Sequence, residues 1–327
     1  MMSKKWNVYV ARKLPEPLEE MLREYCEVEI NPRDVLEDRK VYLQKIKGKD
    51  GLITDSRVAV TEEVYEAAGP QLKIVSNYAV GFNNIDVAGA TKRGIVVTNT
   101  PGVVNNATAD IAWALMFAAA RRISEADRLI RTKEPWGWTP SFLQGRDIVG
   151  KTLGIIGAGR IGTTMAKRAR GFDMNILYSD RSRNETLEQQ MGARQVDVET
   201  LLREADYVSL HTPLTAETRH MISAKQFEIM KPTAILINTS RGEIIDEKAL
   251  VEALRTGQIW GAGLDVFEKE PCVTPELFEL DNIVMTPHIG TATIGTRRAM
   301  AETASQNVID IMLGKPSAKV VNPEVLK

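Results

Sequence analysis

The chain has 327 residues, 43% hydrophobic and 26% charged, which is typical of globular proteins and favours two domains over one. Its 42 Lys and Arg residues balance 43 Asp and Glu residues without a long basic block, so nucleic acid is not an expected partner. The longest strongly apolar run, residues 111–120, is too short to span a bilayer, and the two cysteines are far apart in sequence. We expect a cytoplasmic protein with no membrane partner and no metal site.

Short β-branched runs alternate with helical patterns along the first hundred residues. Strands are expected at residues 7–10, 51–53 and 72–76, and helices at 16–25 and 62–68. Such alternation is typical of βαβ units, in which helices connect the parallel strands of one sheet. The first part of the chain is therefore expected to form a parallel α/β domain.

A second series of expected strands begins at residue 152. These runs are apolar almost without interruption, as expected for parallel strands covered by helices on both faces. The strands are expected at 152–156, 175–178, 207–210, 234–238, 261–266 and 283–285. The two series together predict an α/β fold with two doubly wound parallel sheets.

Two long helical patterns, at residues 106–131 and 294–313, separate these series from each other and from the C-terminus. They would connect two domains. Because no flexible Gly/Ser linker is present, we expect the domains to touch, with a ligand in the cleft between them.

The sharpest local signal is the glycine motif at residues 152–162, where an apolar strand runs into G-x-G-x-x-G and then into a helix. Gly157 would allow the tight turn, Gly159 the close approach of a pyrophosphate, and Gly162 the packing of helix on strand. The N-terminus of the helix would bind the phosphates. Further contacts to a dinucleotide are expected from Ala158, Arg160 and Ile161.

Asp180 follows the next strand, where a carboxylate would bind the ribose hydroxyls of NAD. Arg181 and Arg183 come directly after it, and an arginine at this place would accept the 2'-phosphate of NADP. Both cofactors are therefore open, and we favour NAD with tolerance of NADP.

Arg241, Glu270 and His288 each follow one of the expected strands of the second series. Ligands of open parallel sheets bind beyond the carboxyl ends of the strands, so these three groups are expected to form one site. The other two histidines, His211 and His220, are expected to be structural or surface residues.

The chemistry of this set suits the reduction of a 2-oxo acid by a nicotinamide cofactor. His288 would donate the proton to the developing alkoxide, and Glu270 would favour the imidazolium and orient it. Arg241 would bind the substrate carboxylate through its planar guanidinium. In the first domain, backbone N–H groups of Val80 and Gly81 could bind the same carboxylate, although this segment could also be a plain turn.

At this level of detail the chain resembles the D-2-hydroxyacid dehydrogenases, and most closely their glyoxylate and hydroxypyruvate reductase branch. The resemblance covers nearly the whole chain and depends on the glycine motif together with several other segments. These segments are residues 77–86, 106–110, 211–215, 238–243, 263–271 and 287–290. In this family the catalytic Arg, Glu and His fall on Arg241, Glu270 and His288.

The resemblance implies two Rossmann-like domains. Residues 1–104 and 293–327 would form a discontinuous, flavodoxin-like substrate domain, and residues 105–292 the NAD(P)-binding domain. It also implies a homodimer formed largely through the long helix after Asn106.

Individual roles are implied as well. Thr108 would contact the cofactor pyrophosphate, and Asp265 would lie near the nicotinamide carboxamide. Trp138 matches a tryptophan that reaches the neighbouring subunit's site, although it could equally be a packing residue. The remaining expected cofactor contacts are Thr212, Thr239, Ser240, His288 and Gly290.

Other readings of the same sequence remain. A roomier pocket would suit a sugar-derived 2-oxo acid such as 2-ketogluconate, and related folds occur in dinucleotide-binding corepressors. Val80 stands where the similar phosphite dehydrogenases have lysine, which argues against that activity. Thr291 replaces a serine usual in the family and keeps its hydroxyl.

Overall fold

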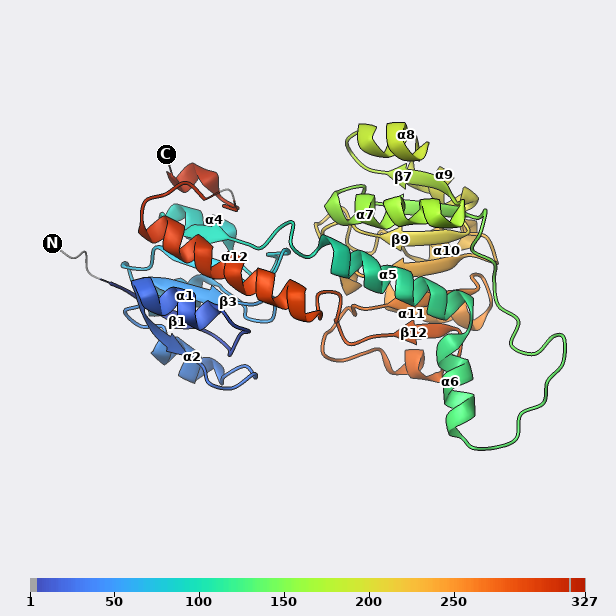
Figure 1. The fold of residues 1–327 in the computed structure, drawn as a ribbon, viewed down its shortest axis with the longest axis horizontal. Helices are drawn as coiled ribbons and strands as arrows, with labels where there is room; N and C mark the ends of the chain where they lie inside the picture. Colours follow the sequence, from blue (N-terminus) through green and yellow to red (C-terminus); the bar gives the residue numbers. More distant parts are fainter. Residues whose placement is uncertain (1–4, 318, 327) are drawn as a thin grey trace. The chain divides into compact units, whose positions relative to one another are not determined.

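The computed structural model describes residues 5–317 and 319–326, which form two compact units. The first unit combines the residues up to 104 with those from 292 onward, and the second comprises residues 105–291. Each unit contains one parallel sheet, so the expected α/β class with two parallel sheets is confirmed (Figure 1). None of the helices in these ranges has the length and apolarity that a membrane crossing requires.

The sheet of the first unit has the strand order β2-β1-β3-β4-β5. Its strands are β1 (Trp6–Val10), β2 (Cys26–Ile30), β3 (Gly51–Thr54), β4 (Ile74–Asn77) and β5 (Val96–Thr98). Its helices are α1 (Leu18–Tyr25), α2 (Arg39–Lys45), α3 (Glu62–Ala68), α4 (Val87–Lys92) and α12 (Ile294–Met312), with the 3-10 helix η4 (Pro323–Leu326). This is the strand order of a flavodoxin-like sheet. From β1 the chain first adds β2 on one side and then adds β3, β4 and β5 on the other.

The C-terminal segment completes the first unit through long-range hydrogen bonds. Ser76 Oγ at β4 donates to the Ala304 carbonyl of α12 at 2.9 Å. The Asn322 side chain accepts from Val97 N at 2.8 Å and donates to the Ile95 carbonyl at 2.9 Å, next to β5. The two ends of the chain therefore build one core.

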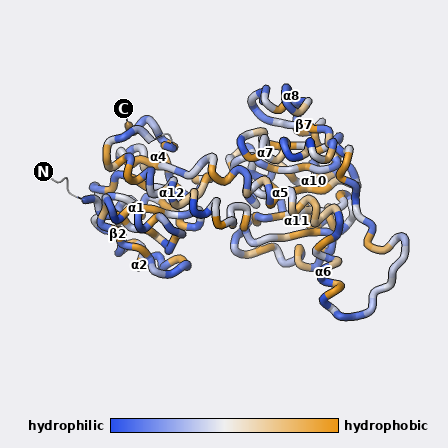
Figure 2. The backbone as a smooth tube through the Cα atoms, in the orientation of Figure 1, coloured by the Kyte–Doolittle hydropathy of each residue, from blue (hydrophilic) through white to orange (hydrophobic). Residues whose placement is uncertain are grey.

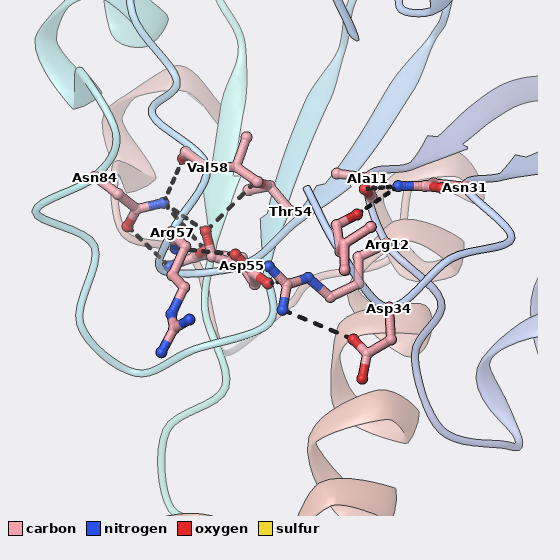
Figure 3. A network of polar contacts seen from close by, with 11 residues as sticks. Ala11, Arg12, Asn31, Asp34, Thr54, Asp55, Arg57, Val58 and Asn84 are labelled. Atoms are coloured by element: carbon pink, nitrogen blue, oxygen red, sulfur yellow. Dashed lines mark hydrogen bonds and ion pairs between the residues drawn. The ribbon is translucent and has the colours of Figure 1, made fainter. Parts of the chain in front are cut away.

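A polar network joins the carboxyl ends of β1 and β3 in this unit (Figure 3). Arg12 Nε lies 2.9 Å from Asp55 Oδ2, and its Nη1 lies 3.7 Å from Asp34 Oδ1. Asn84 Nδ2 donates to the carbonyls of Asp55 and Val58, each at 3.0 Å. The network fixes the loop at residues 77–86 against the loop that follows β3.

The sheet of the second unit has the order β12-β11-β10-β9-β6-β7-β8. Its strands are β6 (Thr152–Ile156), β7 (Asn175–Ser179), β8 (Arg194–Gln195), β9 (Tyr207–Leu210), β10 (Ile235–Asn238), β11 (Gly261–Leu264) and β12 (Ile283–Met285). The chain runs outward from β6 to β8 and then crosses to β9 on the other side of β6. This switch point is where open parallel sheets bind ligands.

Helices cover both faces of that sheet. They are α5 (Asn105–Ala120), α6 (Ile123–Arg131), α7 (Arg160–Ala169), α8 (Glu185–Met191), α9 (Val198–Glu204), α10 (Ala224–Ile229) and α11 (Glu247–Arg255). Three 3-10 helices complete the unit: η1 (Arg170–Phe172), η2 (Gly242–Ile244) and η3 (Pro275–Glu279). One buried core lies under α5 and α7 and a second under α9, α10 and α11, and hydrophobic residues run through the interior in Figure 2.

The single helix expected at residues 106–131 is wrong, because the structure has two helices there. Arg122 adopts a left-handed conformation with φ of 53° and forms ion pairs with Glu125. The Ala120 carbonyl accepts a hydrogen bond from Arg146 N at 2.8 Å, so a distant segment replaces the next helical turn. The helix therefore ends at Ala120, and α6 starts in a new direction.

Candidate active site

The glycine loop between β6 and α7 is shaped by two close approaches. Gly157 has φ of 94°, and a Cβ there would lie 2.7 Å from the backbone of His211 and Thr212 at the end of β9. A Cβ at Gly162 would lie 2.1 Å from the Gly157 carbonyl oxygen. Only glycine fits both positions, and Gly159 caps the ten-residue helix α7, whose first N–H groups lie beyond β6. The loop thus has the form expected of a phosphate-binding turn.

The loop after β7 is tied to this turn by two hydrogen bonds to Ala158. Asp180 Oδ2 accepts from Ala158 N at 2.8 Å, and Asn184 Nδ2 donates to the Ala158 carbonyl at 2.7 Å. Asp180 is half-buried, whereas Arg181 is exposed. The expected carboxylate and the adjacent arginines are therefore held beside the glycine loop.

The side chains of His288 and Glu270 are in direct contact in the second unit. His288 Nδ1 lies 2.7 Å from Glu270 Oε2, and the other carboxylate oxygen accepts from Phe267 N at 3.1 Å. The side chains are 32% and 23% exposed, so both can meet a ligand from solvent. Because Nδ1 faces the carboxylate, Nε2 is the ring atom placed to exchange a proton with a substrate.

Asp265 organises the backbone around His288, which has a left-handed φ of 57°. Its Oδ1 accepts from Thr286 Oγ1 at 2.6 Å and from Ile289 N at 2.8 Å, and its Oδ2 accepts from Gly290 N at 2.7 Å. Burial raises the pKa of Asp265, and these hydrogen bonds oppose the shift by favouring the carboxylate. The carboxylate therefore holds the loop that presents the imidazole.

Arg241 lies three residues beyond the end of β10 and is the N-cap residue of η2. Its Nη1 donates to the Ser240 carbonyl at 2.6 Å, and its own carbonyl accepts from Asn238 Nδ2 at 2.8 Å. Burial lowers the pKa of Arg241, and the nearby carboxylates of Glu270 and Glu243 oppose that shift. A Cβ at Gly242 would lie 1.9 Å from the Phe267 carbonyl carbon, so the Arg241 turn packs on the segment that carries Glu270.

Several other expected residues line the same edge of the sheet. Thr108 on α5 is buried, and a Cβ at Gly290 would lie 3.7 Å from its methyl carbon. Thr239 Oγ1 is buried without a hydrogen-bond partner among the described residues. A buried hydroxyl with unused bonding capacity just beyond the end of β10 fits a polar ligand such as a dinucleotide.

The structure does not gather every expected residue in one unit. Val80 and Gly81 belong to the first unit, where Asn99 and Asn77 donate to their carbonyls, each at 2.8 Å. Trp138 is 82% exposed and lies on the segment between α6 and β6.

His211 and His220 lie outside the pair formed by His288 and Glu270. His211 Nε2 lies 2.9 Å from Ser209 Oγ, and burial lowers the pKa of His211 to about 4, so the ring is neutral at pH 7. His220 Nε2 lies 3.3 Å from Glu268 Oε1.

Sequence reasoning missed residues that position the catalytic set. Asn238 is fully buried at the end of β10, and its Oδ1 accepts from Ser240 N at 3.0 Å. Thr286 bonds to Asp265, which holds the loop of His288. Glu247 bonds to Glu268, on the segment that carries Glu270. Asn238 and Thr286 stand at the ends of apolar strands, which was the available signal, but their partners, like those of Glu247 in α11, are set by tertiary structure.

Comparison with known proteins identifies the family. Residues 113–290 match the family model described as "D-isomer specific 2-hydroxyacid dehydrogenase, NAD binding domain". The chain is 49% identical to a glyoxylate reductase of Thermococcus onnurineus, over 98% of this chain and 97% of the relative. It is 50% identical to that of Thermococcus litoralis, over 98% of each chain.

Solved structures agree. A glyoxylate reductase from Paecilomyes thermophila superposes with a TM-score of 0.88 at 34% identity, covering 98% of this chain and 99% of that one. An NADPH-dependent glyoxylate/hydroxypyruvate reductase from Sinorhizobium meliloti, in complex with NADP and malonate, gives 0.84 at 30% identity, with 97% of each chain covered. The resemblance inferred from the sequence is thereby confirmed: this chain belongs to the D-isomer specific 2-hydroxyacid dehydrogenase family and is an NAD(P)-dependent oxidoreductase.

Proposed function

We propose that this enzyme reduces glyoxylate and hydroxypyruvate to the corresponding 2-hydroxy acids, with D configuration where the product is chiral. The observation that carries the proposal is the 2.7 Å pair of His288 and Glu270, on the segment that packs against the Arg241 turn. Glyoxylate reductases that share about half of this sequence support the choice of substrate.

The residues divide the work as follows. The nicotinamide cofactor supplies the hydride when bound. His288 Nε2 donates the proton to the carbonyl oxygen, while Glu270 at Nδ1 stabilises the imidazolium and fixes the ring. Arg241 binds the substrate carboxylate and polarises the carbonyl, an interaction strengthened by its burial.

The cofactor binds along the carboxyl ends of the strands of the second unit. The glycine loop and Thr108 hold the pyrophosphate. The Thr239 hydroxyl, which has no hydrogen-bond partner among the described residues, forms a hydrogen bond with the dinucleotide. Asp180 accepts from the ribose hydroxyls and favours NAD, whereas exposed Arg181 allows NADP. Residues 105–292 are accordingly the cofactor domain, and residues 1–104 with 293–327 are the substrate domain.

The active form is a homodimer, and we place the enzyme in the cytoplasm. The surface for a second copy lies on α6 and the following segment rather than on α5, which its own unit buries. Ile123 and Ile130 of α6 are 52% and 53% exposed, and Trp136 and Trp138 are 54% and 82% exposed. Trp138 reaches the substrate site of the neighbouring copy.

A panel of 2-oxo acids, each run with NADH and with NADPH, tests the function. Glyoxylate and hydroxypyruvate should be reduced with higher kcat/KM than pyruvate or 2-ketogluconate. The His288→Ala variant should lose about 100-fold or more in kcat while it still binds NADH, as measured by fluorescence. A preference for 2-ketogluconate would overturn the substrate assignment, and loss of NADH binding in the variant would overturn the role of His288.

A further inference from the structure

The loop after β7 contains two arginines in different environments. Arg181 is exposed and makes no hydrogen bond or ion pair with any residue the structure describes. Arg183 is bound to Glu188 of α8, with Nε and Nη2 lying 2.7 Å and 2.5 Å from Glu188 Oε2. The two cations are therefore not equally available to a ligand.

Glu188 is itself held from the side of the sheet. Its Oε1 accepts from Tyr178 Oη at 2.7 Å, and Tyr178 is a fully buried residue of β7. Tyr178 Oη in turn accepts from Asn184 N at 2.9 Å. Hydrogen bonds from Arg183 and then Tyr178 lower the pKa of Glu188, which keeps it ionised at neutral pH. The carboxylate is thus a fixed negative charge with a defined geometry.

The position of this pair matters because its loop adjoins the proposed ribose site. Asp180 and Asn184, on either side of Arg183, both bond to Ala158 in the glycine loop. A ribose bound at Asp180 would therefore have both arginines within the same short loop. A phosphate on the 2'-oxygen would be stabilised by each guanidinium that can turn toward it.

We propose that Glu188 is a specificity-determining residue for the cofactor, because it holds Arg183 against α8 and so withholds a second cation from a 2'-phosphate. The inference rests on the proposed cofactor site at Asp180. It assigns discrimination against NADP to a residue that does not itself touch the nucleotide. Arg181 remains as the cation that allows NADP to bind.

The test compares dissociation constants for NADH and NADPH, measured by nucleotide fluorescence, in matched variants. Glu188→Gln keeps the shape and can still accept from Tyr178, but it releases Arg183. We expect it to improve NADPH binding relative to NADH by about threefold, the size typical of losing one exposed ion pair. Glu185→Gln removes a charge that acts on Arg183 only through a weaker Coulomb interaction and keeps the contact with Glu188, so it should change the ratio less than Glu188→Gln does.

A double variant identifies Arg183 as the released group. Arg183→Gln alone should change the ratio little, because the guanidinium is already engaged, and Arg183→Gln/Glu188→Gln should lose the gain of Glu188→Gln. Competition by adenosine 2',5'-bisphosphate against 5'-AMP should follow the same order. An unchanged ratio in Glu188→Gln, or an equal change in Glu185→Gln, overturns the inference. If the wild type binds neither dinucleotide, the proposed cofactor site fails instead.

Discussion

Glu270 illustrates how one side chain can hold and orient another. Its carboxylate contacts His288 Nδ1 at 2.7 Å and so stabilises the imidazolium that the reduction consumes. Glu270→Gln keeps a hydrogen-bonding group but removes the charge. We expect kcat for glyoxylate to fall about 100-fold, because the imidazole loses the charged partner that holds its Nδ1 and orients Nε2.

Steady-state kinetics with glyoxylate at pH 7 check this prediction. NADH binding, followed by fluorescence, serves as the control because Glu270 is assigned no cofactor contact. A variant that keeps the kcat of the wild type would show that Glu270 only packs beside the histidine.

His211 makes the second unit sensitive to acid. Burial lowers its pKa to about 4 in the folded chain, whereas an unfolded histidine titrates near 6.5. Below about pH 6.5 the unfolded chain therefore takes up a proton that the folded chain takes up only near pH 4, and stability falls with pH across that window. A fully buried ring would lose about 2 kcal/mol by pH 5, and since this residue is only partly shielded from solvent, we expect about 1 kcal/mol.

Urea unfolding at pH 7 and pH 5 measures the effect. His211→Gln retains a partner for Ser209 but does not titrate, so its loss of stability between the two pH values should be smaller by about 1 kcal/mol. His220→Gln, at an exposed histidine, should not reduce that loss. Equal pH dependence in wild type and His211→Gln would rule out this role.

The placement of Arg241, Glu270 and His288 beyond strand ends could be predicted from the sequence, because each lies within a few residues of the end of a short apolar run. The bonding of Asp265 could not. The strand expected at residues 261–266 ends at Leu264, so Asp265 turns toward the backbone of residues 289 and 290. That choice depends on the neighbouring β12, which local sequence does not reveal.

At the scale of elements, a reciprocal pair joins α11 to the segment that carries Glu270. Glu247 Oε1 accepts from Glu268 N at 2.7 Å, and Glu268 Oε1 accepts from Glu247 N at 2.8 Å. Glu247 Oε2 also accepts from the Thr274 hydroxyl. Because Glu247 is only 4% exposed, these contacts are shielded from water and fix the segment on both sides of Glu270.

Glu247→Ala should therefore loosen the catalytic pair from a distance. Removing the carboxylate leaves Glu268 N and the Thr274 hydroxyl without their acceptor, which costs about 1–3 kcal/mol for each buried group left unpaired. We expect lower unfolding stability and a kcat reduced about tenfold, with partial recovery of both in Glu247→Gln. Kinetics at saturating NADH measure kcat, and thermal unfolding measures stability, in both variants. A normal kcat in a destabilised Glu247→Ala protein would limit Glu247 to a structural role.

Elements were predictable where they were long or strongly apolar. The strands β6, β9 and β12 match their expected bounds. The strands β2, β5 and β8 were missed. Glu27 and Glu29 interrupt β2, which follows α1 directly, β5 has only three residues, and β8 has only two, both exposed. The break before α6 was missed because its cause, the Arg146 contact to Ala120, is long-range.

At the scale of the whole molecule, the return of the C-terminal segment to the first unit could not be derived from periodicity. It depends on contacts such as that between Ser76 and Ala304, which join residues distant in the chain. The expectation of a discontinuous domain came from resemblance to a family. The expectation of a dimer also came from that resemblance. The exposed residues of α6 allow it to be tested.

Ile130→Glu should weaken the proposed dimer. Ile130 is 53% exposed on α6, and a carboxylate at a buried apolar contact would lose its hydration without gaining a partner. We expect the dimer dissociation constant, measured by sedimentation equilibrium, to rise at least about tenfold.

Val35→Glu, at a residue of the first unit with the same 53% exposure, provides the matched control and should leave the dimer mass unchanged. If Trp138 completes the neighbouring site, Trp138→Ala raises KM for glyoxylate in the intact dimer, and Ile130→Glu raises it only at concentrations where the dimer dissociates. A wild type that is monomeric at micromolar concentration, yet fully active, would contradict both assignments.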